Sequence, residues 1–208
     1  STSHEFHVLA DSGEDDIAFS TSGDYAANVE MVPSLAPSSP RAEPTQEMIT
    51  VDTPKQHSIE EVSKFLKVDP TQVLKTLIVA GDDDALVALV IRGDHELNAI
   101  KAQNLDGVHD PLRMAAPEAI RKQTGCGLGS IGPVGLKIRT YVDHAAAAAA
   151  NFVCGANAEG QHITGVNWGR DLAEPTSVGF RNVATGLPRT DDNWERELKH
   201  GCEAGHRF

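Results

Sequence analysis

Apolar residues fall along this chain in short runs that either alternate with polar residues or form continuous stretches between turn-forming residues. Such runs predict β-strands at 3–10, 18–20, 48–54, 74–80, 86–93, 137–143, 162–168 and 199–208. Acidic turns join the first run to the second and the fourth to the fifth. The pattern therefore predicts two β-hairpins, one near the start of the chain and one in its middle.

Helical periodicity predicts helices at 59–66, 71–73, 95–105, 117–124 and from 144 to about 154. The first has a capping box, because Ser58 precedes Glu61 by three residues. The last follows Asp143, a good N-cap residue, and Gly155 ends it. Segment 24–32 fits either a short helix or an extended stretch. Strands and helices alternate through the middle of the chain, which predicts an α/β domain with a mixed β-sheet and surrounding helices.

Four prolines between Pro33 and Pro44 mark the clearest boundary in the chain. We therefore expect a linker at 33–47 and the α/β domain at 48–186. The ends, 1–32 and 187–208, are expected to belong together, so that the domain is inserted between them. Both ends also look cut from a longer polypeptide.

The charge is concentrated at the beginning of the chain. The net charge is −12, which argues against a general nucleic-acid surface. Residues 1–50, however, contain nine Asp or Glu and one Arg, whereas 51–208 contain 21 acidic and 17 basic residues. The nearly balanced middle could hold the end of a nucleic acid, though not a long duplex.

The composition is that of a protein with a packed core, since 40% of its 208 residues are hydrophobic. No apolar run approaches the roughly 20 residues of a membrane span, so we expect no membrane partner. The three cysteines are far apart and include no CxxC pair. They predict reduced thiols in a cytoplasmic protein.

Two local features could carry chemistry. Lys75 lies within an apolar strand, where an ammonium group needs an anion or an acceptor, or must extend to water. The residues alone slightly favour extension to water. The glycine-rich loop Gly129–Pro133 could bind a ribose, a carboxylate or an oxyanion through its backbone amides, although most such loops are ordinary turns. For Asp94 and Asn98, helix capping is the better interpretation.

The histidines near the start of the chain do not predict a metal site. His4 and His7 alternate on one predicted strand and do not match the HExxH pattern of a zinc helix.

Several segments, taken in order, resemble bacterial-type prolyl-tRNA synthetase. They are SHEFHVLADSGEDDIAFSTSGDYAANVE, VDTP, VLKTLIV, ALVIRGDHELNAIKA, GSIGPVGL, ANAEGQHITGVNWGRDL, RNV and the terminal GCEAGHRF. The resemblance covers nearly the whole chain. It implies an editing (insertion) domain of the YbaK-type aminoacyl-tRNA deacylase superfamily at 48–186, flanked by short strands of a class II synthetase core. The chain departs from the family at Arg207 and over 187–199.

The resemblance also implies an activity. The family's insertion domain hydrolyses alanine mistakenly attached to the acceptor end of tRNA(Pro), and editing needs no cofactor. The parent enzyme is a cytoplasmic, homodimeric proline–tRNA ligase that uses ATP and Mg. Missing methylenes are worth only about 1–3 kcal/mol in a binding pocket, which is why a second sieve for alanine is required. Because the ATP-binding motifs are absent, this piece is not expected to charge tRNA.

Site residues follow from the resemblance by position. Lys75 matches the family's essential editing lysine, and His162 matches a histidine that helps to fix the aminoacyl group. The GxxxP loop that lines the site corresponds to Gly129, Ser130, Ile131, Gly132 and Pro133. Thr53 and Asp143 match further pocket residues, and Glu5 and His206 match positions near the proline pocket of the parent core.

The resemblance implies a metal-free mechanism in which amides near Gly129 and Ser130 hold the ester oxygen. Lys75 contacts the phosphate or carbonyl of the acceptor end, and a ribose hydroxyl activates water. Two alternatives remain. One is an insertion that binds the acceptor end without hydrolysis, and the other is a free-standing trans-editing factor, which the flanking core-like segments disfavour.

Overall fold

The computed structural model describes residues 4–9, 15–20, 26–28, 34, 36–182 and 196–207. The chain forms two compact units. One consists of Ser1–Leu35 and Asn182–Phe208, and the other of Ala36–Arg181. The first unit is described through the backbone of its strands.

The first unit contains a four-stranded antiparallel sheet in the order β1-β11-β2-β3. Its strands are β1 (His4–Leu9), β2 (Asp15–Ser20), β3 (Ala26–Asn28) and β11 (Arg196–Arg207). The predicted hairpin between the first two runs is wrong, because β11 lies between β1 and β2. The extended alternative for 24–32 is correct at β3, and the final strand is confirmed.

The register of β1 and β11 makes Glu5 the partner of His206. The two positions that match the family's proline pocket therefore lie opposite each other on paired strands. Their side chains lie outside the described residues.

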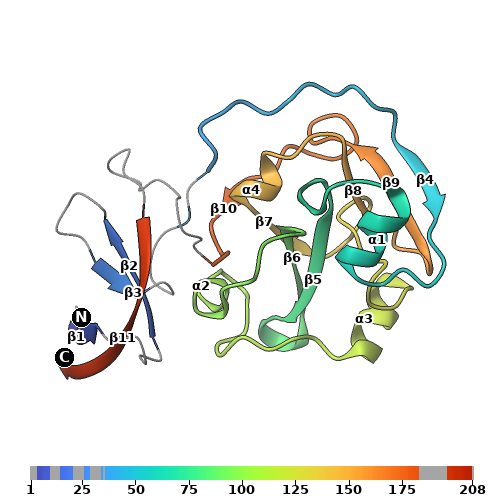
Figure 1. Ribbon diagram of the computed structural model, residues 1–208. Coiled ribbons are helices and arrows are strands. Elements are labelled where there is room, and N and C mark those ends of the chain that lie inside the picture. The colour runs from blue at the N-terminus through green and yellow to red at the C-terminus, as the bar shows by residue number, and fades with distance from the viewer. Residues whose placement is uncertain are drawn as a thin grey trace. The chain divides into compact units, whose positions relative to one another are not determined.

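The second unit has two sheets, as Figure 1 shows. The larger has the order β10-β7-β6-β5, with β5 (Leu74–Ala80), β6 (Leu86–Arg92), β7 (Arg139–Asp143) and β10 (Ser177–Val178). The smaller has the order β4-β9-β8, with β4 (Ile49–Asp52), β8 (Phe152–Gly155) and β9 (Gln161–Val166). The predicted β5–β6 hairpin is confirmed, and β6–β7 and β7–β10 are parallel. The mixed α/β architecture is thus confirmed.

The helices are short. They are α1 (Ile59–Leu66), α2 (Ala99–Gln103), α3 (Pro117–Thr124), α4 (His144–Ala147) and the 3-10 turns Pro70–Gln72 and Asp82–Asp84. The predicted bounds of α1 and α3 are confirmed, as is the capping box of Ser58 and Glu61. Asn98 caps α2 as predicted. Asp94 instead pairs with Arg92 at 2.6 Å, so capping is wrong for Asp94.

The long alanine-rich helix predicted up to Gly155 is wrong. The helix α4 ends at Ala147, and β8 begins at Phe152. Asn151, between them, has a φ of 51°, which a right-handed helix does not allow. Strand β8 is buried along its whole length, because Phe152 and Cys154 pack in the core between the sheets while Val153 packs with α1. Burial on both faces of the strand therefore outweighs the local helix propensity of alanine.

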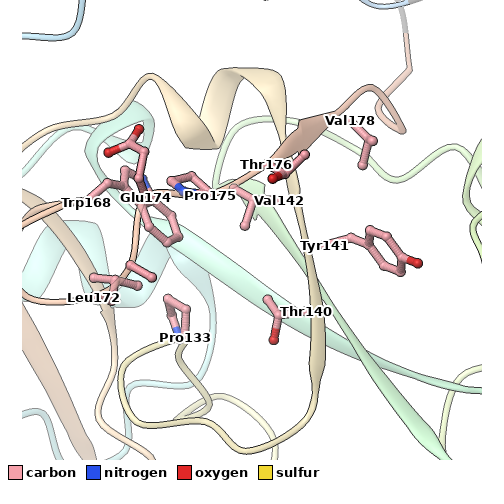
Figure 2. Close-up of a pocket in the computed structure, with 11 residues that line it drawn as sticks. Pro133, Thr140, Tyr141, Val142, Trp168, Leu172, Glu174, Pro175, Thr176 and Val178 are labelled. Carbon is pink, nitrogen blue, oxygen red and sulfur yellow. The ribbon is translucent and has the colours of Figure 1, made fainter.

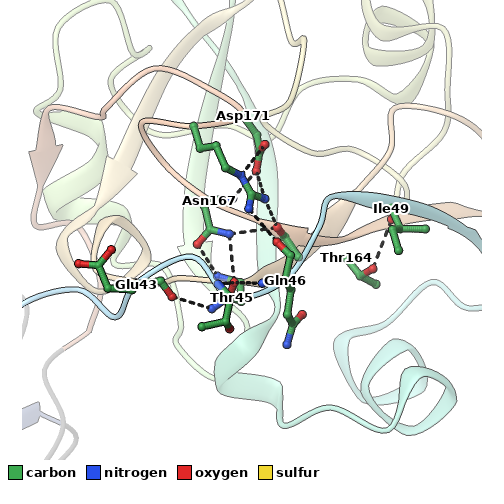
Figure 3. Close-up of polar contacts among 10 residues, drawn as sticks. Glu43, Thr45, Gln46, Ile49, Thr164, Asn167 and Asp171 are labelled. Carbon is green, nitrogen blue, oxygen red and sulfur yellow. Dashed lines mark hydrogen bonds and ion pairs between the residues drawn. The ribbon is translucent and has the colours of Figure 1, made fainter.

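Residues 36–48 precede β4 without helix or strand, yet polar contacts fix this segment to the domain (Figure 3). Asn151 Oδ1 accepts hydrogen bonds from the backbone N–H groups of Thr45 and Gln46. The guanidinium of Arg170 donates to the Gln46 carbonyl at 2.7 Å. These contacts hold the segment that leads into β4 against the domain.

Candidate functional site

The start of β5 and strand β8 lie side by side. Val73, just before β5, forms a parallel bridge with Val153 of β8, and both side chains pack against α1. The following residue on each strand faces the core between the sheets. Because side chains alternate along a strand, Lys75 and Gly155 share the outer face with Val73 and Val153.

His162 of β9 extends this face by one strand. It is the register partner of Gly155, and its neighbour Ile163 packs into the core between the sheets. His162 therefore faces outward, as Gly155 does. Lys75, Gly155 and His162 thus form a row across β5, β8 and β9, which we call the outer row.

Lys75 is half-buried at one end of the outer row. Its Nζ donates a hydrogen bond to the carbonyl oxygen of Gly93 at 3.2 Å. Burial lowers the pKa of Lys75, and the carboxylates of Glu96 and Asp94 oppose that shift. Gly93 takes one of the three N–H donors of the ammonium among the residues that the structure describes. Lys75 is therefore equipped to donate to a further acceptor, such as a substrate oxygen.

His162, at the other end of the row, is paired with Thr53. The Thr53 Oγ1 and His162 Nδ1 atoms lie 2.7 Å apart, and both residues are buried. The backbone N–H of Thr53 donates to the Gly160 carbonyl, which holds the main chain of Thr53 next to the start of β9. Burial lowers the pKa of His162, and the nearby His57 adds to this effect. The imidazole is therefore held as a neutral hydrogen-bonding group at neutral pH.

Asn157 anchors the loop that contains Gly129–Pro133. Its side-chain amide donates to the carbonyls of Gly132 and Val134 and accepts from the Gly132 N–H. Its backbone N–H donates to the Ser130 carbonyl, and Ser130 Oγ accepts from the Gly160 N–H. The side chain of Ile131 is buried in a core cluster. The middle of the loop, residues 130–132, is thus buried and held by hydrogen bonds.

The loop lies directly on Gly155, in the middle of the outer row. A Cβ atom on Gly132 would lie 1.9 Å from the Gly155 carbonyl oxygen, and one on Gly155 would lie 2.3 Å from the Ser130 carbonyl carbon. Gly129 has a φ of +91° and packs on the backbone of His57. Glycine is required here because the two backbones touch. The structure therefore brings the predicted loop together with Thr53, which bonds Gly160 as Ser130 does, and with Gly155, the register partner of His162. Strand alternation places Lys75 in the same row, on the other side of Gly155.

Two residues of this arrangement did not stand out in the sequence. The sequence predicts Gly155 as the end of a helix and indicates no role for Asn157. Asn157 has a φ of 54°, a conformation that Asn tolerates better than most residues. The signal that could have found both is the segment Gly155–Gly160, where two glycines flank an Asn just before a predicted strand.

Asp143 lies in a separate polar cluster. Its carboxylate accepts from the backbone N–H groups of Ala145 and Phe180, and Oδ1 lies 3.5 Å from Arg181 Nε. The capping of α4 by Asp143 is confirmed. All these partners are within the fold, and Asp143 is fully buried. Its role in binding substrate stays a prediction.

A cavity of about 410 Å³ lies beside the loop (Figure 2). Pro133, the last residue of the loop, lines it together with residues of β7, of β10 and of the segment after β9. These are Thr140, Tyr141, Val142, Trp168, Leu172, Ala173, Glu174, Pro175, Thr176 and Val178. The cavity and the outer row are therefore two distinct places that share one loop.

Among the described residues, no three His, Cys, Asp or Glu side chains are grouped so that they could hold a metal ion. Within the same part of the chain, no helix is long and apolar enough to cross a membrane.

Comparison with known proteins gives both a family and a fold. The family model described as aminoacyl-tRNA editing domain matches residues 53–172. One similar solved structure is that of a proposed trans-editing enzyme for prolyl-tRNA synthetase, with a TM-score of 0.55 and 20% identity over 65% of this chain and 87% of that one. A scaffold protein used for computational epitope grafting has a TM-score of 0.55 and 20% identity over 66% of this chain and 88% of its own. At these identities the two structures support the fold alone.

Proposed function

Because the chain belongs to the aminoacyl-tRNA editing domain family, we propose that it hydrolyses the ester bond of alanyl-tRNA(Pro). The observation that carries this proposal is the position of the Gly129–Pro133 loop directly over Gly155, the middle residue of the outer row. The row carries the ammonium of Lys75 at one end and the neutral imidazole of His162 at the other, and the loop adds amide donors at its middle. These are groups that can hold an ester and stabilise charge on its carbonyl oxygen.

In the proposed reaction, water attacks the carbonyl carbon that joins alanine to the terminal ribose. The Gly132 N–H is already bonded to Asn157, so the N–H groups of Gly129 and Ser130 are left to hold the oxyanion. Lys75 contacts the phosphate or carbonyl oxygen, and His162 fixes the aminoacyl group. A new C–O bond to water forms and the ester C–O bond breaks. The proton of the water, relayed by the neighbouring ribose hydroxyl, ends on the released ribose oxygen.

Alanine is the proposed amino acid because it is smaller than proline and must therefore be removed in a second, editing step. A pocket shaped for proline cannot strongly exclude the smaller alanine, so the error must be removed afterwards by hydrolysis. Thr53, Ile131, Gly132, Pro133 and Asp143 are the proposed contributors to substrate binding. For Asp143 the contribution is indirect, since its contacts are internal.

The proposed setting is the editing insertion of a prolyl-tRNA synthetase, at 48–186. What supports it is that one compact unit is built from both ends of the chain, as an insertion between two parts of a core requires. Strand β11, from the end of the chain, pairs with β1 and β2 from its beginning. The proposed parent uses ATP and Mg to charge tRNA, is a homodimer and works in the cytoplasm.

The test is hydrolysis of alanyl-tRNA(Pro) by the full 208-residue chain. Prolyl-tRNA(Pro) serves as the control substrate, which should not be hydrolysed. Lys75→Ala should lower the rate by roughly 100-fold, the usual effect of removing one charged or oxyanion-stabilising donor. Lys122→Ala, at an exposed position of α3, is the matched control and should leave the rate unchanged.

Three outcomes would count against parts of the proposal. Equal rates for the unaltered chain and Lys75→Ala would reject the site. Equal hydrolysis of the alanyl and prolyl esters would reject the proposed selectivity for alanine over proline. Tight binding of alanyl-tRNA(Pro) without hydrolysis would favour a non-hydrolytic module that binds the acceptor end.

A further inference from the structure

The cavity beside the loop has the size and lining of a ligand site. Its volume of about 410 Å³ falls within the range of roughly 300–1,000 Å³ that is common for small-molecule sites. Its walls are mostly apolar, and the polar side-chain groups of its lining residues include a carboxylate and the hydroxyls of two threonines, Thr140 and Thr176. The hydroxyl of Tyr141 and the indole N–H of Trp168 donate within the fold, to the carbonyls of Asp106 and Ala146. A flat, weakly polar ring with one hydrogen-bonding edge matches such a lining.

The carboxylate of Glu174 is fixed at the edge of this cavity. Arg41 donates to both of its oxygens, one of the bonds being 2.9 Å long, and Arg41 is itself tied to the Ala147 carbonyl. A carboxylate has about four acceptor positions. The Arg41 pair occupies two, so Glu174 can still accept from an amino group of a ligand while its own charge remains compensated.

The cavity is also adjacent to the outer row through the loop. Gly132 touches Gly155 of the row, and Pro133, the next residue, lines the cavity. A residue spans at most about 3.6 Å, and successive nucleotides in a strand are roughly 3.4 Å or more apart. A tRNA strand whose terminal ribose lies at the outer row can therefore place the preceding base in the cavity.

We propose that this cavity binds the base of the cytidine that precedes the terminal adenosine of tRNA. The inference rests on the proposed function. Every tRNA ends in the sequence CCA, so this base is always present. Among the pyrimidines only cytosine carries an exocyclic amino group, and a carboxylate is its usual protein acceptor. Apolar and aromatic walls, here including Trp168, suit the faces of a base.

The first experiment compares two substrates, alanyl-tRNA(Pro) and 3′-O-alanyl adenosine, which lacks the cytidines. Thr140 is exposed and lines the cavity, so Thr140→Trp fills the cavity from its rim. This variant should hydrolyse alanyl-tRNA(Pro) at least about tenfold more slowly, the loss expected for one base contact, and alanyl adenosine at the unaltered rate. Gln123→Trp, at an exposed position of α3 away from the cavity, should change neither rate. An equal effect of Thr140→Trp on both substrates, or no effect on either, would overturn the proposal.

The second experiment exchanges the base. Replacing the cytidine by uridine puts an oxygen acceptor where the amino group was, so the unaltered chain should slow by about tenfold. Glu174→Gln keeps the shape of the side chain and adds a donor, and it should restore hydrolysis of the uridine substrate relative to the cytidine one. If Glu174→Gln leaves the base preference unchanged, the carboxylate does not read the base.

A third measurement separates this inference from the proposed function. If the unaltered chain hydrolyses neither substrate, the proposed hydrolysis fails. The cavity is then tested by binding of the trinucleotide CpCpA, followed by NMR. Binding that Thr140→Trp abolishes and Gln123→Trp preserves supports the cytidine site, and the absence of binding by the unaltered chain overturns it.

Discussion

Gly132 and Gly155 meet backbone to backbone: a Cβ atom on Gly132 would lie 1.9 Å from the carbonyl oxygen of Gly155. The contact joins a loop to a strand, with no side chain between them. It sets the height of the loop above β8, next to the register partner of Gly155, His162. Small shifts in the position of a reacting group have large effects on rate, so this contact is where the fold and the chemistry depend most directly on each other.

Gly132→Ala should therefore impair hydrolysis more than it impairs folding. The added methyl group must push the loop off β8, and we expect a loss of roughly 100-fold in kcat/KM for alanyl-tRNA(Pro) and about 1–3 kcal/mol in the free energy of unfolding. Gly125→Ala is the control. Gly125 has a φ of 79° and open space around it, so the variant costs about 1–2 kcal/mol through backbone strain without moving the loop. Equal kinetic losses in the two variants would show that stability alone explains them.

Asn157 should matter for the same reason. It holds the loop through its side chain at Gly132 and Val134. Asn157→Gly keeps the left-handed backbone conformation but removes the amide, so the loop loses its anchor without backbone strain. We expect about a tenfold or greater decrease in kcat with alanyl-tRNA(Pro), measured in single-turnover reactions. Asn104→Gly, at the exposed end of α2, is the control. An unchanged kcat for Asn157→Gly would mean that the loop keeps its position without the amide.

The parts of the fold that the sequence predicted correctly depend on neighbouring residues. The capping box of Ser58 and Glu61 sets the start of α1, and two apolar runs around an acidic turn give the β5–β6 hairpin. The features of the fold that the sequence did not predict depend on distant partners. Strand β11 separates β1 from β2, and no local pattern indicates a strand arriving from the other end of the chain.

The residues of the candidate site also fall into two groups, those that could be predicted and those that depend on distant partners. Lys75, His162 and the Gly129–Pro133 loop were identified through resemblance to a family, since their residue types alone left simpler interpretations open. Gly155 and Asn157 escaped because their roles are backbone contacts that exist only after β8 has formed. The alanine run concealed β8, because local helix propensity points the wrong way where burial decides the outcome.

His162 gives the site a pH dependence with a definite sign. Burial lowers its pKa from the usual 6.5 in the folded chain, so between the folded pKa and about 6.5 the unfolded chain binds more protons. Stability is therefore fully present above pH 6.5 and is lost as the pH falls through the folded pKa. His95, whose pKa is also lowered by burial, adds to the same trend.

The measurement is an NMR titration of the His162 imidazole, together with urea unfolding at pH 5 and 7.5. The titration midpoint should lie below 6.5, and hydrolysis should decrease as the imidazole becomes charged. His162→Gln should reduce the difference in unfolding free energy between the two pH values, and His95 should account for the remainder. A midpoint above 6.5 would contradict the neutral role of His162.

Variants of Asp143 can distinguish a role in the stability of the fold from a role in binding substrate. Its carboxylate is fully buried, caps α4 and faces the guanidinium of Arg181. Asp143→Ala removes that carboxylate from beside a buried positive charge, and such changes cost about 3–5 kcal/mol. Asp143→Asn keeps an oxygen that can accept from the Ala145 N–H, so it should cost less. Urea unfolding of both variants, compared with Lys75→Ala, checks the order. If Asp143 acts only through the fold, kcat/KM per folded molecule should equal that of the unaltered chain. A decrease beyond the loss of folded protein would instead support its place in the substrate pocket.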